Sequence, residues 1–121
     1  MSEWFNPSEL MLLAKKLVED VDYSPESRYR TAVNRAYWSA FLAAYVMLLK
    51  RGKSFPNVGR IHKDVRLAVQ DELPKIGNKL EKLHEDFRVP ADYYVFQSID
   101  KARAQESIRI SEVIVASMEK M

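Results

Sequence analysis

Residues 28–50, RYRTAVNRAYWSAFLAAYVMLLK, form the stretch of sequence that decides the fold. Between Arg35 and Lys50 lie fourteen consecutive residues without a charge, rich in alanine, leucine and aromatic residues, a composition that favours a helix and requires burial. A membrane-spanning helix needs about 20 apolar residues, so this shorter run predicts a buried helix of a globular protein.

The two sides of this helix differ in the size of their side chains. At about 100° per residue, small residues gather in one stripe and bulky residues occupy the broad opposite face. The stripe consists of Ala32, Ala36, Ser39 and Ala43, and the bulky face of Tyr37, Trp38, Phe41, Tyr45 and Leu48. A helix that is apolar nearly all round needs neighbours on most of its circumference, so we expect it to be the central helix of a bundle.

The composition is that of one globular domain spanning residues 1–121. Hydrophobic residues make up 47% and there are only 3 glycines, which favours a helical protein, and the absence of cysteine excludes disulfides and thiolate metal sites. A net charge of +2 permits contact with nucleic acid without requiring it. The first residues lack a basic segment followed by an apolar run, so we expect no signal peptide, no membrane contact and a cytoplasmic location.

Capping and breaking residues divide the chain into five predicted helices. Helix starts at Asn6-Pro7-Ser8-Glu9 and Ser24-Pro25-Glu26 predict helices over about 7–20 and 25–51. Apolar spacing predicts a third helix over about 60–73, interrupted by Pro74 and Gly77. A capping box at Asn78 begins the fourth.

The fourth helix is expected to end at Val89, because a residue before proline is pushed toward extended geometry. Residues 89–98 are then irregular, and Ser98 or Asp100 caps a final helix. Nothing reads as a strand. The sequence therefore predicts an all-α, single-domain, up-down bundle of about five helices.

Three short segments, in this order along most of the chain, resemble the HEPN family. They are RAYWSAF at 35–41, Ile61-His62-Lys63, and Phe87-Arg88 followed by Ala91-Asp92-Tyr93. They are similar to the branch of that family with an R-A-Y-Y-A-A-F helix, a His-Lys step and an L-R-x-x-A-D-Y end. Trp38 and Phe87 replace a tyrosine and a leucine that are more common there, and both keep a bulky apolar group.

HEPN domains are small helical bundles found in prokaryotic toxins, in antitoxin-like partners of minimal nucleotidyltransferases, and in defence proteins. The resemblance implies a homodimer whose polar groove binds a nucleotide, RNA or a separate nucleotidyltransferase. A purely structural partner subunit is an alternative. No cofactor is implied. The candidate nucleotide- or phosphate-binding residues are Arg35, Tyr37, Lys63, Arg88, Asp92 and Tyr93, with His62 in the same groove.

The sequence lacks the pattern by which the RNA-cutting members of this family are recognised. That pattern is an arginine and a polar residue, with a histidine some four to six residues later, and neither Arg35 nor Arg88 is followed by one. A non-enzymatic role is therefore favoured. In the alternative, a metal-independent ribonuclease, His62 is the acid or base because imidazole titrates near pH 7. His84 is expected on the surface, and two histidines so far apart predict no metal site.

Each candidate also has a structural interpretation. Arg35 could form an ion pair at the edge of the uncharged run, and Tyr37 could be a core residue with a satisfied hydroxyl. Arg88 and Asp92, four residues apart, could pair as a structural clasp. His62 could cap a helix or lie on the surface.

Overall fold

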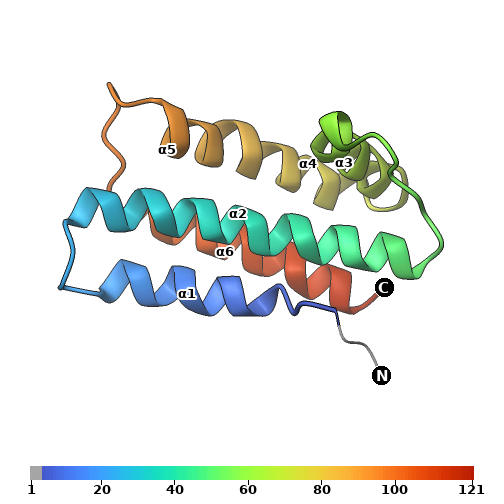
Figure 1. The fold of residues 1–121 in the computed structure, drawn as a ribbon, viewed down its shortest axis with the longest axis horizontal. Helices are drawn as coiled ribbons and strands as arrows, with labels where there is room; N and C mark the ends of the chain where they lie inside the picture. Colours follow the sequence, from blue (N-terminus) through green and yellow to red (C-terminus); the bar gives the residue numbers. More distant parts are fainter. Residues whose placement is uncertain (1–3) are drawn as a thin grey trace.

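The computed structural model describes residues 4–121, and over this range all regular structure is helical, which confirms the all-α prediction. Figure 1 shows two layers, with α1, α2 and α6 in one layer and α3, α4 and α5 in the other. The helices are α1 (Ser8–Glu19), α2 (Pro25–Lys50), α3 (Ile61–Glu72), α4 (Pro74–Lys82), α5 (Val89–Tyr93) and α6 (Lys101–Glu119). A 3-10 turn, Val58–Arg60, precedes α3, and a π-helical segment, Leu83–Arg88, joins α4 to α5.

Helix α2 is the central helix, as its composition predicts. Its small residues let α1 and α6 approach closely, and buried serines bond the backbones together. Ser39 Oγ donates to the carbonyl of Pro7 at 2.9 Å, and Ser111 Oγ on α6 donates to the carbonyl of Ala36 at 2.6 Å. Within residues 4–121, no helix is both long and apolar enough to cross a membrane.

The predicted ends of the first three helices agree with the structure to within one residue. The side chain of Asn6 accepts a hydrogen bond from the N–H of Ser8 at 3.0 Å, so it does serve the start of α1. At the start of α6, Asp100 Oδ1 accepts from the N–H of Arg103 at 2.8 Å. Of the two predicted caps, Asp100 is the one that the structure uses.

The third helix ends before Pro74 as predicted, but the prediction that Gly77 interrupts the chain and that the fourth helix begins at Asn78 is wrong. Pro74 opens α4, at a position where a missing N–H costs nothing, and the helix continues through Gly77. Gly77 is buried where α4 crosses α3, and a Cβ there would lie 2.1 Å from Gln70 Cγ and 2.7 Å from its Cα. This glycine therefore permits a close helix crossing instead of ending a helix.

The predicted helix end before Pro90 is also wrong, because the chain stays helical through α5. In the π-helical segment the N–H of Val89 bonds to the carbonyl of His84, five residues back. Pro90 has no N–H to offer the carbonyl of Asp86, and Arg103 on α6 donates to that carbonyl through Nη2. The segments α4, π-helix and α5 thus form one continuous helix, and the described chain has the five predicted helical units.

Candidate functional site

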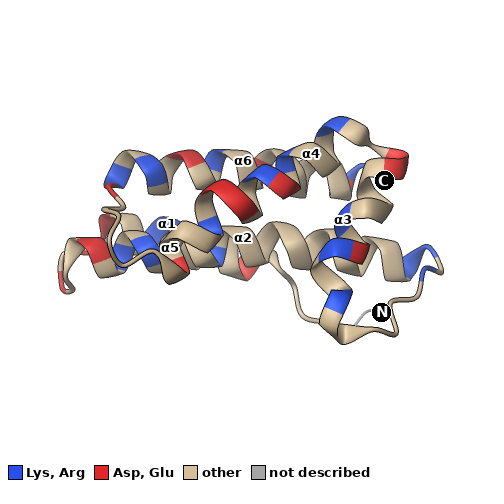
Figure 2. Cartoon of the chain, turned by 90° about the horizontal axis from the view of Figure 1, so that it is seen from above, with Lys and Arg blue, Asp and Glu red and all other residues tan. Residues whose placement is uncertain are grey.

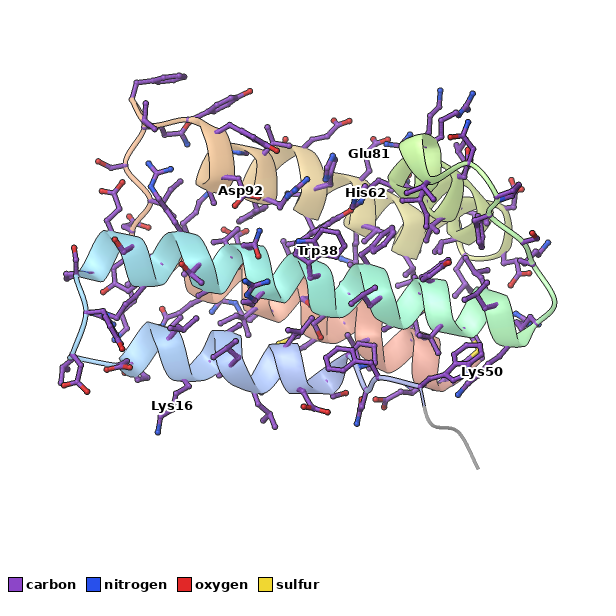
Figure 3. The ribbon with its side chains drawn as sticks, in the orientation of Figure 1. Lys16, Trp38, Lys50, His62, Glu81 and Asp92 are labelled. Atoms are coloured by element: carbon purple, nitrogen blue, oxygen red, sulfur yellow. The ribbon has the colours of Figure 1, made fainter. Side chains whose placement is uncertain are left out.

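A group of titratable side chains meets where the α3–α5 layer covers α2. We call it the imidazole cluster. In Figure 3, Trp38 and His62 mark its position between the two layers. Helix α2 supplies one member, α3 supplies two, and the π-helical segment supplies two. The members are Tyr37, His62, Arg66, His84 and Arg88.

Tyr37 lies at the base of the imidazole cluster. Its side chain is 1% exposed, and its hydroxyl lies 2.5 Å from Nδ1 of His62. Burial raises the pKa of Tyr37 above its usual value, and the nearby charges of Arg88 and Arg66 oppose that rise only in part. The predicted core tyrosine with a satisfied hydroxyl is confirmed, and the phenol is neutral at pH 7.

The two histidines come together although they are far apart in the sequence. Their rings stack with centroids 5.6 Å apart. Burial lowers the pKa of His62 to about 4, and the charges of His84 and Arg88 act in the same direction. Burial also lowers the pKa of His84, as do Arg88 and Arg66, against the opposing effect of Asp92. Both imidazoles are therefore neutral at pH 7, and the prediction that His84 is a surface residue is wrong.

Arg66 is a member of the cluster that sequence reasoning missed. Its side chain is 19% exposed, and its Nε is buried without a hydrogen-bond partner. Nη1 lies 3.4 Å from a carboxylate oxygen of Glu81 and 4.0 Å from one of Glu85. Its position four residues after His62 on one helix face was the signal that could have identified it.

The cluster encloses a small cavity of about 50 Å³. The cavity is lined by Leu80 and by four members of the cluster, Tyr37, His62, Arg66 and His84. The Nδ1 atom of His84 is buried there without a hydrogen-bond partner. A polar cavity of this size has room for a water molecule or for one oxygen of a larger ligand, but not for a nucleotide. A larger ligand would reach the cluster from its rim.

Arg88 lies beside the cavity, with its guanidinium near the ring of Tyr37. The predicted clasp is confirmed, since Arg88 Nε donates to Asp92 Oδ2 at 2.8 Å. Asn34 on α2 also donates to both carboxylate oxygens of Asp92, at 3.2 and 3.0 Å. The guanidinium carbon of Arg88 lies 5.6 Å from the ring centre of Tyr37 and 5.9 Å from that of Tyr93. Among the described residues, its two Nη groups have no hydrogen-bond partner.

Two predicted site residues lie outside these contacts. Arg35 precedes Tyr37 by two residues, about 200° around the helix, on the face from which Ser39 bonds to the start of α1. Lys63 is exposed, and the structure gives it no ion pair within residues 4–121. The structure thus brings together Tyr37 and His62 with the Arg88–Asp92–Tyr93 segment, and it leaves Arg35 apart.

Arg30 fixes the end of the helix that carries the cluster. Its guanidinium donates to the carbonyls of Pro90 at 3.2 Å, Ala91 at 2.9 Å and Tyr94 at 3.1 Å, and also to that of Gln97. These four acceptors lie 60 to 67 residues away in the chain. Such a long-range role for one arginine has no local sequence pattern, so the sequence did not point to it.

The chemistry of the cluster suits an anion better than a cation. Two guanidinium groups repel positive charge, and their N–H groups match the oxygens of a phosphate or carboxylate. Over residues 4–121, the structure contains no group of three or more histidine, aspartate or glutamate side chains placed to hold a metal ion. The neutral imidazoles add a hydrogen-bond donor or acceptor each.

Comparison with known protein families identifies the family of this chain. Residues 9–121 match the family model described as HEPN domain. Comparison with curated proteins found no match. The family match covers nearly the whole chain, including all five helical units and every residue of the imidazole cluster. The chain therefore belongs to the HEPN domain family.

Proposed function

We propose that this HEPN domain is a binding module that holds the phosphate groups of a nucleotide or of RNA at the imidazole cluster. The observation that supports this most strongly is the set of polar groups without a hydrogen-bond partner. Nε of Arg66 and Nδ1 of His84 are buried without one, and Arg88 uses only Nε, whereas Nη1 of Arg66 lies near the carboxylates of Glu81 and Glu85. Partly buried polar groups without partners call for a ligand that completes them.

The electrostatic arrangement around the donors supports the same proposal. The pair with Asp92 leaves the Nη fork of Arg88 free for two parallel bonds to a phosphate. Figure 2 shows basic and acidic residues interspersed along the helices on the face in view. This face therefore has no broad positive surface that would attract a phosphate by charge alone. Recognition would therefore depend on the few donors of the cluster, and a phosphate offers them more acceptor oxygens than a carboxylate does.

The test is equilibrium binding of a short fluorescein-labelled single-stranded RNA, followed by anisotropy. Arg66→Met and Arg88→Met should each weaken binding by about tenfold or more, because a hydrogen bond to a charged group is worth ~1.5–3 kcal/mol. Each variant should also reduce the slope of log affinity against log salt by about 0.7, the value for one phosphate contact on a single strand.

Arg109→Met is the matched control. Arg109 is an exposed arginine of α6, and its loss removes the same charge away from the cluster. Thermal unfolding of all three variants shows whether they remain folded. Equal RNA affinities for Arg66→Met, Arg88→Met and Arg109→Met in folded proteins would contradict the proposal.

A second candidate function is metal-independent cleavage of RNA, because His62 and the guanidinium of Arg88 lie together at the ring of Tyr37. A neutral imidazole can take the proton of an RNA 2′-hydroxyl. The 2′-oxygen then attacks the phosphorus, the bond to the 5′-oxygen breaks, and that oxygen takes a proton from water. The product strand carries a 2′,3′-cyclic phosphate, and Arg88 would stabilise the charge on the phosphate.

This candidate is tested by incubating the labelled RNA with the protein in EDTA. Cleavage that His62→Gln abolishes and Arg109→Met preserves would support it. An RNA that stays intact over a long incubation, while still bound to the protein, would leave binding as the function and exclude cleavage of that substrate.

A further inference from the structure

Beside the imidazole cluster, the last residue of α5 and the loop after it expose four large side chains in succession. We call residues 93–96, Tyr-Tyr-Val-Phe, the aromatic tip. Tyr93 is 64% exposed, Val95 90% and Phe96 81%. Figure 1 shows this loop at the far end of the α3–α5 layer, where it turns back toward α6. Apolar groups left in water in such a cluster mark an interaction site.

The aromatic tip has a fixed shape. Arg30 binds the carbonyl of Tyr94, within the tip, and the carbonyl of Gln97, directly after it. The N–H of Gln97 donates to the carbonyl of Tyr94 at 3.1 Å, which closes the turn. The rings of Tyr94 and Phe96 stack, with centroids 5.2 Å apart and planes 19° apart. The rings are thus held in place in advance, so a ligand would pay little ordering entropy to use them.

The aromatic tip adjoins the free donors of the cluster. Tyr93 lies next to Asp92, the partner of Arg88, and the Arg88 guanidinium carbon is 5.9 Å from the centre of the Tyr93 ring. A planar, mostly exposed ring therefore stands beside a guanidinium whose Nη groups have no partner among residues 4–121. Aromatic rings beside a cationic phosphate site are the combination by which proteins bind unpaired bases.

We propose that the aromatic tip stacks the bases of a single-stranded RNA whose phosphates are held by Arg88 and Arg66. This inference rests on the proposed function and narrows its ligand class. An unpaired strand offers both base faces and phosphates, whereas a duplex hides the base faces and inorganic phosphate has none. A protein partner is less favoured, because the exposed residues form only a small surface. They also adjoin the Nη groups of Arg88, which have no partner among the described residues and suit a phosphate.

The experiment compares a single-stranded RNA with an abasic strand of the same length and the same number of phosphates. Tyr93→Leu and Phe96→Leu should each weaken binding of the RNA by at least about fivefold, since stacking on one aromatic residue contributes this much or more. Neither variant should change the affinity for the abasic strand. Tyr93→Phe should bind the RNA like the unmodified protein, because it keeps the ring.

Tyr23→Leu is the matched control, since Tyr23 is 66% exposed on the loop between α1 and α2. The abasic strand also tests whether Tyr93→Leu acts by displacing Arg88, because displacement would weaken the binding of both strands. A fully paired duplex should bind more weakly than the single strand. Thermal unfolding identifies any variant that fails to fold.

The outcomes separate this inference from the proposed function. If RNA affinity falls in Arg88→Met but is the same in Tyr93→Leu, Phe96→Leu and Tyr23→Leu, stacking is wrong and phosphate binding stands. If neither strand binds the protein, both are wrong. If the tip variants change only the sedimentation of the protein and not its RNA affinity, the tip is a contact between copies of the chain, which also overturns stacking.

Discussion

The hydroxyl of Tyr37 and Nδ1 of His62 lie 2.5 Å apart in a site where both groups are uncharged at neutral pH. Because the chain has only 2 histidines, their imidazole protons can be followed individually by NMR. We expect one to titrate at about pH 4, that of His62, and the other below its ordinary value. Tyr37→Phe identifies the His62 signal, because only that ring loses a hydrogen bond.

A titration midpoint near 6.5 for both rings would show that they are solvated and would contradict the geometry of the cluster. The same spectra provide a test of anion binding. A bound phosphate brings negative charge to both imidazoles and should raise both pKa values. The Arg109→Met protein should show the same increase.

Stability should depend on pH through His62. Its folded pKa lies below its unfolded value of about 6.5, so the unfolded chain binds the proton more tightly. The contribution of neutral His62 is therefore fully present above about pH 6.5 and is lost as the pH falls toward 4. Urea unfolding at several pH values measures it. The stability advantage of the unmodified protein over His62→Gln should shrink over this range, whereas a constant difference would contradict the prediction.

Arg103→Met should destabilise the domain by about 1–3 kcal/mol, because it leaves the carbonyl of Asp86 without the donor that replaces the N–H of Pro90. It also removes the guanidinium that lies 4.0 Å from the ring centre of Phe87. The comparison is Arg109→Met on the same helix, whose stability should change by no more than about 0.5 kcal/mol. Denaturant unfolding gives both values, and equal stabilities would show that the carbonyl has no need of Arg103.

Gly77→Ala should destabilise the domain by about 1–3 kcal/mol or more, although alanine is the better helix former. The added Cβ would meet the backbone of Gln70, with 2.8 Å to its nitrogen, so the crossing of α3 and α4 must widen. Lys79→Ala, at an exposed position of the same helix, should have little effect. If Gly77→Ala raised the melting temperature, helix propensity would outweigh the close crossing.

The central helix and most helix ends could be predicted because their signals are local. The uncharged run after Arg35 and the cap at Asp100 depend on residues next to each other in the chain. Pro90 and Gly77 were misread because their effects depend on a neighbouring helix: Arg103 of α6 serves the carbonyl of Asp86, and Gly77 packs against Gln70 of α3. A proline is tolerated within a helix when another group donates a hydrogen bond to the carbonyl that the proline leaves unpaired. A glycine can permit two helices to cross closely as well as allow a turn.

Some residues of the candidate site could also be predicted from local sequence signals, and others could not. His62 and the Arg88–Asp92 pair came from the family motifs and from four-residue spacing, and the structure places His62 and Arg88 together at the ring of Tyr37. Arg66 and His84 belong to no quoted motif. They join the cluster because the packing of α3 and the π-helical segment on α2 brings them there, which a single sequence does not encode locally. Arg35 belongs to the motif but lies about 200° around α2 from Tyr37.

The contact between α2 and α6 has a consequence for how the chain folds during synthesis. Ser111 bonds to the carbonyl of Ala36 across 75 residues, and the residues of α6 that cover α2 extend to Met118. The part of α2 that α6 covers therefore stays open until α6 has been synthesised. A ribosome stalled before α6 would carry a nascent chain with an exposed apolar strip on α2, which is a surface that chaperones bind.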